Sequence, residues 1–142
     1  MNKKYKIGYT TGVFDLFHIG HLNILKKAKE KCEYLIVGVS TDELVKEYKK
    51  KSPIIPFEER KQIVEAIKYV DKVVKQEDHD KLSAQKILGF DVMFHGDDWK
   101  NSHLYNEIEE KFKENGVDLV YFPYTKDTST TKLSRILEEM FE

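Results

Sequence analysis

The sequence is poor in cysteine, in uncompensated charge and in long apolar runs. It has one cysteine, Cys32, so the chain cannot close a disulfide within itself. Cys32 ends a stretch with helical spacing, Leu22 to Cys32, and we expect a small buried apolar residue there rather than a nucleophile. The 24 basic and 25 acidic side chains leave a formal net charge of -1. This balance argues against a protein that coats nucleic acid and against an acidic disordered tail.

No apolar run is long enough to cross a membrane, and the first residues have neither the apolar core nor the cleavage site of a signal peptide. A single cysteine also fits a reducing compartment. We therefore expect a cytoplasmic protein without a membrane partner. Hydrophobic residues make up 40% of the chain, which is enough for a core, and 142 residues suggest one domain spanning 1–142.

Short β-branched runs alternate with longer amphipathic segments. Strands are predicted at Tyr5–Thr10, Tyr34–Val39, Lys72–Val74, Asp91–His95 and Val117–Phe122. Helices are predicted at Leu22–Cys32, after Thr41, at Phe57–Val70, at Asp80–Leu88, around Leu104–Phe112 and from Leu133 onward. This alternation favours an α/β fold, a Rossmann-like doubly wound parallel sheet of about five strands with helices on both faces. Because such folds bind ligands at the carboxyl ends of their strands, the loops there are the first places to look for a site.

Two histidines follow the first predicted strand, with His18 and His21 three residues apart and Gly20 between them. At this spacing both imidazoles lie on one face of a helical turn, and Gly20 lets a ligand approach the backbone. The free amides of a helix N-terminus attract phosphate. We therefore expect the loop to stabilise negative charge that develops on phosphorus. Alone, either histidine is better explained as a capping or core residue, and no HExxH motif or cysteine cluster supports a zinc site.

The residues around these histidines resemble those of a known family. Gly-Val-Phe-Asp at 12–15, followed by His-Ile-Gly-His at 18–21, resembles the signature of the HxGH nucleotidyltransferases. Ser-Thr-Thr at 129–131 resembles a second signature, usually written RTxGISTT in the cytidylyltransferase branch. Gly-Asp-Asp-Trp at 96–99 and the compact length are similar to the bacterial glycerol-3-phosphate cytidylyltransferases. The resemblance covers almost the whole chain.

The resemblance implies an enzyme that transfers CMP from CTP to glycerol 3-phosphate or a similar small polyol phosphate, giving CDP-glycerol and pyrophosphate. It implies Mg²⁺ bound with CTP, no covalent enzyme intermediate, and catalysis mainly by positioning and charge neutralisation. It also implies a homodimer that acts on two small molecules, CTP and a phosphomonoester, and serves the synthesis of a cell-surface polysaccharide or teichoic acid.

Roles for single residues follow from the same resemblance. His18, His21, Lys49 and Lys51 are implied to be catalytic, and Lys49 with Lys81 is implied to bind the acceptor. Alternate residues of an extended segment point the same way, so Lys49 and Lys51 are expected to enter one site. No metal ligand is identified. The implied nucleotide-binding residues are Val13, Phe14, Asp15, Gly20, Lys68, Asp97, Asp98, Trp99, Tyr124, Thr125, Thr128, Ser129, Thr130 and Thr131.

Simpler explanations exist for several of these residues. A run of lysines is usually a solvated helix end, Asp15 could begin a helix, and the hydroxyls at 128–131 could cap one. Capping and phosphate binding are compatible there. Trp99 and its two aspartates could instead pack a loop. Arg60 could hold either a helix or the site, and we favour the structural role.

The chain departs from the family pattern at two arginines. Tyr124 and Lys68 occupy positions where the family has arginines that contact the triphosphate. Lysine keeps a point charge without the bidentate fork, and tyrosine keeps neither. Lys126 is a candidate to compensate. Two alternatives stay open: an adenylyltransferase of the same superfamily, and a nucleotide-binding sensor without catalysis, which the change at Tyr124 motivates.

Overall fold

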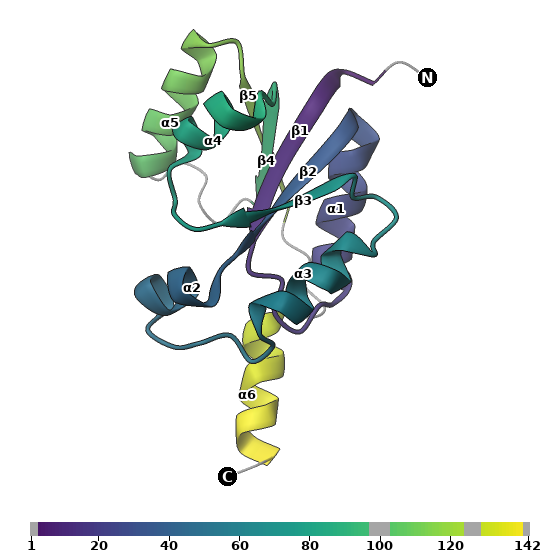
Figure 1. Ribbon diagram of the computed structural model, residues 1–142, viewed down its shortest axis with the longest axis vertical. Coiled ribbons are helices and arrows are strands. Elements are labelled where there is room, and N and C mark those ends of the chain that lie inside the picture. The colour runs from purple at the N-terminus through teal and green to yellow at the C-terminus, as the bar shows by residue number, and fades with distance from the viewer. Residues whose placement is uncertain (1–2, 97–102, 124–128, 141–142) are drawn as a thin grey trace.

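The computed structural model describes residues 3–96, 103–123 and 129–140. Its centre is a five-stranded parallel sheet in the order β3-β2-β1-β4-β5 (Figure 1). The chain adds β2 and β3 on one side of β1 and then returns to add β4 and β5 on the other, so the switch point lies between β1 and β4. The predicted doubly wound parallel sheet is confirmed. The strands are β1 (Tyr5–Gly12), β2 (Cys32–Ser40), β3 (Lys72–Gln76), β4 (Val92–Gly96) and β5 (Asp118–Phe122).

Helices cover both faces of the sheet and build two apolar clusters. On one face, α1 and α3 pack with Leu25, Ala28 and Val64 against strand residues such as Val37. On the other face, α4 and α5 pack with side chains such as Phe112. The helices are α1 (Ile19–Lys31), α2 (Asp42–Lys49), α3 (Phe57–Glu65), α4 (Lys81–Leu88), α5 (His103–Glu114) and α6 (Thr130–Met140).

Cys32 is the first residue of β2 and not the last turn of a helix. The preceding helix ends at Lys31, and Cys32 takes an extended backbone because it pairs with Tyr5 of β1. Its expected burial is confirmed: the side chain is buried and its thiol donates a hydrogen bond to the carbonyl of Ala28 at 3.3 Å. Burial raises the pKa of this thiol to about 11, so it stays protonated and unreactive at neutral pH.

Two other expectations from the sequence are wrong. The helix that starts at Phe57 ends at Glu65, well before Val70, because the chain must turn back to the amino end of β3. It turns through tight i to i+3 bonds, in which the amides of Ile67 and Val70 donate to the carbonyls three residues earlier. The spacing of Ile63, Ile67 and Val70 also predicts one apolar face for this helix, but Ile63 is 43% exposed and the neighbouring Val64 is buried.

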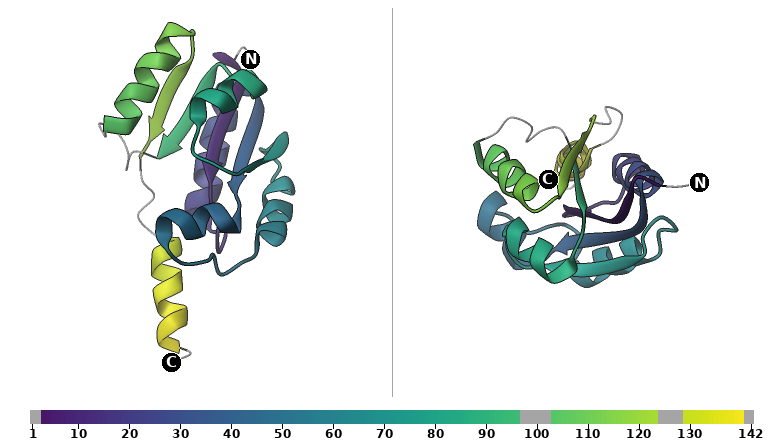
Figure 2. Two further views of the ribbon diagram at one scale, coloured as in Figure 1. Left: turned by 60° about the vertical axis from the view of Figure 1, so that its left-hand side comes forward. Right: turned by 90° about the horizontal axis from the view of Figure 1, so that it is seen from above.

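The carboxyl ends of the strands meet α2 and α6. Helix α2 follows β2 immediately, and its N-cap Thr41 accepts a hydrogen bond from the amide of Leu44 at 3.1 Å. Helix α6 begins near these strand ends and extends away from the sheet (Figures 1 and 2). Among the described residues, no helix is both long enough and apolar enough to span a bilayer.

Candidate functional site

A cavity of about 620 Å³ opens at the carboxyl ends of β1 and β4, at the switch point of the sheet. The end of β1 and its following loop, the first turn of α1, the end of α2 and the start of α6 form its walls. This is the edge where doubly wound sheets bind ligands. The predicted site residues that line it are Val13, Phe14, Asp15, His18, Gly20, His21, Lys49, Lys51, Ser129, Thr130 and Thr131.

The loop after β1 has an unusual backbone. Phe14 has a φ of 56° and Leu16 a φ of 50°, in the left-handed region that side chains rarely adopt. Phe14 is nonetheless buried, and its ring packs so tightly that a Cβ at Gly12 would lie 2.9 Å from it. Burial of this ring therefore offsets the backbone strain, of about 1–3 kcal/mol for each such residue. Gly12 is required for space, and the loop holds one fixed shape beneath the cavity.

His18 and His21 form a capping box at the start of α1. His18 is the N-cap, and its Nδ1 accepts a hydrogen bond from the amide of Gly20 at 3.1 Å. The amide of His18 in turn donates to Nδ1 of His21 at 3.2 Å. The two rings stack with centroids 4.0 Å apart. Because both Nδ1 atoms accept, each neutral ring carries its proton on Nε2.

The proton on Nε2 of His18 has a defined partner in α6. Nε2 lies 3.2 Å from Oγ1 of Thr130, whose own hydroxyl donates to the carbonyl of Asp15 at 2.9 Å. Thr130 therefore accepts from His18. This chain of bonds links the start of α1, the start of α6 and the loop after β1. It also shows that an N–H donor of His18 lies at the hydroxyl-rich start of α6.

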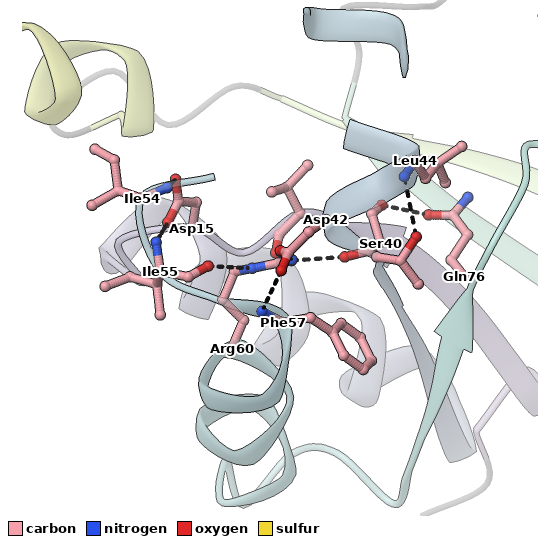
Figure 3. A network of polar contacts seen from close by, with 11 residues as sticks. Asp15, Ser40, Asp42, Leu44, Ile54, Ile55, Phe57, Arg60 and Gln76 are labelled. Atoms are coloured by element: carbon pink, nitrogen blue, oxygen red, sulfur yellow. Dashed lines mark hydrogen bonds and ion pairs between the residues drawn. The ribbon is translucent and has the colours of Figure 1, made fainter. Parts of the chain in front are cut away.

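Asp15 holds a neighbouring loop rather than starting a helix. Its two carboxylate oxygens accept hydrogen bonds from the amides of Ile54 and Ile55, each at 2.8 Å (Figure 3). Asp15 is buried, and both of its oxygens are occupied by these bonds. The side chain thus fixes the segment that follows the lysine run at the wall of the cavity.

Arg60 ties together the elements around the cavity. Its guanidinium donates to the carbonyls of Val13, Ser40 and Ile55 at 2.6, 2.8 and 2.8 Å, and to Asp42 at 2.6 Å (Figure 3). These acceptors belong to the loop after β1, the end of β2, the segment before α3 and the start of α2. The favoured structural role of Arg60 is confirmed, and it serves the helix and the site together.

The two lysines reach the cavity by a different route from the one expected. Lys49 is the last residue of α2, and Lys50 takes a left-handed conformation, φ 60°, that ends the helix. The extended segment predicted here is therefore wrong, although both Lys49 and Lys51 line the cavity. The turn at Lys50, and not strand alternation, directs both side chains to one side. Lys51 lies 3.6 Å from Glu138 of α6.

Most of the chain matches the model of one protein family. A family model described as cytidylyltransferase-like covers residues 9–136, which include every wall of the cavity up to Arg135 of α6. The protein belongs to this family.

Curated relatives of this cytidylyltransferase-like chain divide between two activities. It is 37% identical over 126 residues to the glycerol-3-phosphate cytidylyltransferase of Bacillus subtilis, an alignment that covers 87% of this chain and 91% of that protein. It is 38% identical over 134 residues to the FAD synthase of Pyrococcus abyssi, covering 92% and 89%. The family is thus a nucleotidyltransferase family, and identity alone does not separate the two substrates.

Solved structures show the same fold. The lipopolysaccharide core biosynthesis protein from Thermoplasma volcanium superimposes with a TM-score of 0.72 at 26% identity, over 87% of this chain and 99% of that one. The pantoate-beta-alanine ligase from Francisella tularensis superimposes with a TM-score of 0.61 at 15% identity, over 97% of this chain and 71% of that one. The second likeness shows the fold alone.

Both histidines of the cytidylyltransferase-like site are neutral at physiological pH. Burial lowers the pKa of His18, and burial, with smaller contributions from His18 and Lys49, lowers that of His21 to about 3. Neutral imidazoles with the proton on Nε2 can donate one hydrogen bond each to a phosphate oxygen. They act as fixed dipoles and not as cations.

The lowered pKa of His21 predicts acid sensitivity of the fold. Between about pH 6.5 and pH 3 the unfolded chain binds a proton at His21 that the native state does not, so stability falls as pH falls through this window. From pH 7 to pH 5 the wild type should lose about 1–2 kcal/mol more unfolding free energy than His21→Asn. Urea unfolding at both pH values measures this difference. Parallel losses in the two proteins would show that His21 titrates normally.

Two predicted site residues do not line the cavity. Lys68 is exposed in the turn that leads into the amino end of β3, at the opposite edge of the sheet, with Nζ 5.3 Å from the ring of Tyr69. Lys81 is buried at the start of α4, and its Nζ donates to Oγ1 of Thr11 at 3.2 Å. Since Thr11 itself lines the cavity, Lys81 lies one side chain behind the wall. Burial lowers the pKa of Lys81 to about 8.

The remaining predicted residues lie outside the described residues. They are Asp97, Asp98, Trp99, Tyr124, Thr125 and Thr128. Conversely, the sequence analysis missed Ser134, Arg135 and Glu138, which line the cavity from α6. Their spacing from Thr131 places them on one face of a helix, and that periodicity could have identified them. His95 also lines the cavity, and the centroid of its ring lies 5.1 Å from that of Tyr105.

The described residues do not form a protein-held metal site. Within 3–96, 103–123 and 129–140, no three histidine, cysteine, aspartate or glutamate side chains lie close enough to coordinate one ion. Asp15, the acidic residue of the first signature, has both oxygens occupied by amides. These donors therefore do not fit a resident Mg²⁺.

Proposed function

We propose that this protein transfers CMP from CTP to glycerol 3-phosphate or a similar small polyol phosphate, releasing CDP-glycerol and pyrophosphate. The observation that supports it most is the convergence on one cavity of two neutral histidines, two lysines and the hydroxyl-bearing start of α6. These groups suit a triphosphate, which needs hydrogen-bond donors and positive charge in a confined place. The choice of cytosine and of a polyol phosphate rests on Gly-Asp-Asp-Trp at 96–99 and on the relatives named above.

The reaction we propose is a direct displacement. An oxygen of the acceptor phosphate forms a bond to the α-phosphorus of CTP, and the bond from that phosphorus to the bridging oxygen of the β-phosphate breaks. Negative charge grows on the α-phosphate oxygens and on the departing pyrophosphate. The Nε2–H groups of His18 and His21 donate to these oxygens, and Lys49 and Lys51 neutralise charge at the end of α2. Little else is needed beyond alignment of the two substrates.

His18 must exchange partners when the nucleotide binds. In the structure its Nε2–H donates to Oγ1 of Thr130. A triphosphate oxygen at the start of α6 would take over this donor, and the hydroxyl of Thr130 would turn to the phosphate or keep its bond to Asp15. The capping bond from Gly20 stays in place, so the ring keeps its tautomer during the exchange.

The acceptor phosphate is assigned to the side of the cavity near Thr11. Lys49 lines this cavity, and Lys81 lies directly behind Thr11. With a pKa near 8, Lys81 is largely protonated at neutral pH, and a phosphate dianion would favour its charged form further. Mg²⁺ would be bound with CTP by the phosphate oxygens. We also propose that the protein is a homodimer and that it acts in the synthesis of a surface polysaccharide or teichoic acid.

One assay tests the reaction. Pure protein is mixed with Mg²⁺, one nucleoside triphosphate and one phosphomonoester, and pyrophosphate release is followed over a panel of both substrates. Release that requires CTP and is fastest with glycerol 3-phosphate is expected. If the folded protein releases no pyrophosphate with any pair of nucleoside triphosphate and phosphomonoester, the proposed enzymatic activity is contradicted.

The similarity to FAD synthases supports a second candidate, an adenylyl transfer. FAD consists of FMN joined to AMP, so ATP with FMN belongs in the same panel. Thermal unfolding with each nucleotide adds an independent comparison, because a ligand that binds only the native state raises the melting temperature. A larger shift with ATP than with CTP, together with turnover of FMN, would replace the cytidylyl assignment.

A further inference from the structure

Arginine is rare in this chain, and its two copies have different environments. Of the 24 lysines and arginines, only Arg60 and Arg135 are arginine. Arg60 is buried, and its guanidinium is occupied by three carbonyls and Asp42. Arg135 is exposed and lines the cavity. Within the part of the chain that the structure describes, Arg135 therefore supplies the guanidinium that a ligand in the cavity can reach.

Helix α6 presents one polar face to the cavity. Thr131, Ser134, Arg135 and Glu138 all line it, at the spacing of one helical face. Glu138 is paired with Lys51 across the cavity. Arg135 makes no hydrogen bond or ion pair with the residues described around it, so none of them neutralises its charge. The helix begins after Ser129, which also lines the cavity, with Thr130, whose hydroxyl lies beside His18.

The guanidinium has chemical properties that the lysines around it lack. Its planar fork can donate two parallel hydrogen bonds to two oxygens of a phosphate group, whereas an ammonium acts as a point charge. In a chain that otherwise uses lysine, an arginine that faces the cavity is well suited to bidentate phosphate recognition. The departure at Tyr124 removes the arginine that the family has near the start of this helix.

We propose that Arg135 binds the β- and γ-phosphates of the nucleoside triphosphate and so holds the pyrophosphate leaving group. This assignment rests on the proposed function of the cavity. Arg135 lies on the same helix face as the hydroxyls at 129–131, while Lys81, assigned to the acceptor, lies behind Thr11 of β1. The position of Arg135 thus favours the leaving group over the acceptor. Arg135 replaces, from within α6, the guanidinium absent at position 124.

The test compares ligands that differ in these phosphates. Binding of CTP, inorganic pyrophosphate and CMP is measured by calorimetry for the wild type, Arg135→Gln and Arg135→Lys. Arg135→Gln should weaken CTP and pyrophosphate by about tenfold to a hundredfold and leave CMP unchanged. Arg135→Lys should restore part of the loss. The matched control is Lys132→Gln, because Lys132 is exposed on the same helix and does not line the cavity.

Steady-state kinetics separates this proposal from the reaction itself. Arg135→Gln should raise the KM for CTP and leave the KM for the acceptor unchanged. A rise in the acceptor KM alone, equal losses for CTP and CMP, or unchanged affinity for pyrophosphate would each overturn the assignment. A wild type that binds CTP and pyrophosphate through Arg135 without any turnover would refute the reaction and retain the phosphate site. An unchanged melting temperature of Arg135→Gln confirms that the fold is intact.

Discussion

Replacing Arg60 by methionine is expected to lower the free energy of unfolding by about 2–4 kcal/mol. Methionine fills a similar volume but leaves the carbonyls of Val13, Ser40 and Ile55 without their donor. It also leaves Asp42 without its cation. The side chain of Arg60 is fully buried, whereas that of Asp42 is 39% exposed and can recover some solvation. The loss is therefore smaller than for a fully buried ion pair.

The matched control for this change is the other arginine. Arg135→Met removes the same charge and shape from an exposed helix face, and the free energy of unfolding should stay within about 0.5 kcal/mol of the wild type. Urea titrations of the three proteins, with equal slopes, give the comparison. If Arg60→Met were as stable as the wild type, the network around the cavity would not stabilise the fold. The Arg60→Met protein should also bind CTP more weakly, since the cavity-lining loop at Val13 loses its anchor to the end of β2 and the start of α2.

The order of elements was predictable because each signal for it is local. Apolar runs such as Leu35–Val39 indicate strands buried on both faces, and Thr41 and Gly89 mark where helices begin and end. The location of the site at the carboxyl ends of the strands then follows, because doubly wound parallel sheets bind their ligands there. Boundaries were less predictable. Cys32 fits the periodicity of the helix before it, and only its pairing with Tyr5 of β1 assigns it to a strand.

Some features of the candidate site can also be predicted from local sequence patterns, whereas others depend on contacts between distant segments. His18 and His21 are three residues apart, a spacing that predicts two rings on one face of a helical turn, and in the structure the rings stack. The bonds of Arg60 to Val13 and of Asp15 to Ile54 connect segments tens of residues apart, which no local pattern reveals. Asp15, a residue of the first signature, also holds a loop through its bonds to Ile54 and Ile55, a role that the motif does not indicate.

The direction of the lysine run shows why side-chain placement needs the backbone. Strand alternation predicts that Lys49 and Lys51 enter one site, whereas in the structure the helix end at the left-handed Lys50 brings both to the cavity. It also explains why Lys51 reaches Glu138 of α6. A non-glycine residue with positive φ is not visible in composition or periodicity. Lys49 and Lys51 were therefore placed at one site from a wrong local structure.

Replacing His18 by alanine is expected to lower kcat by about 100-fold to 1,000-fold in the proposed reaction, since it removes one preorganised donor to the transferring phosphate. The same change removes the N-cap of α1, where the Nδ1 of His18 accepts from Gly20, at a cost of about 1 kcal/mol in stability. A fall in activity therefore has two sources, a lost donor and a loosened helix start. Pyrophosphate release and urea unfolding, measured on the same preparation, give both quantities.

His18→Asn separates these two sources. Asparagine is a good N-cap, and its side-chain oxygen can accept the bond from Gly20, so stability should return close to that of the wild type. Its short amide cannot place a donor where Nε2 of His18 meets Thr130, so kcat should stay as low as in His18→Ala. Activity regained together with stability would assign His18 to the helix alone. If the wild type binds CTP yet neither variant changes any rate, because none exists, the protein is a nucleotide sensor, and the fixed Nε2–H of His18 serves recognition instead of transfer.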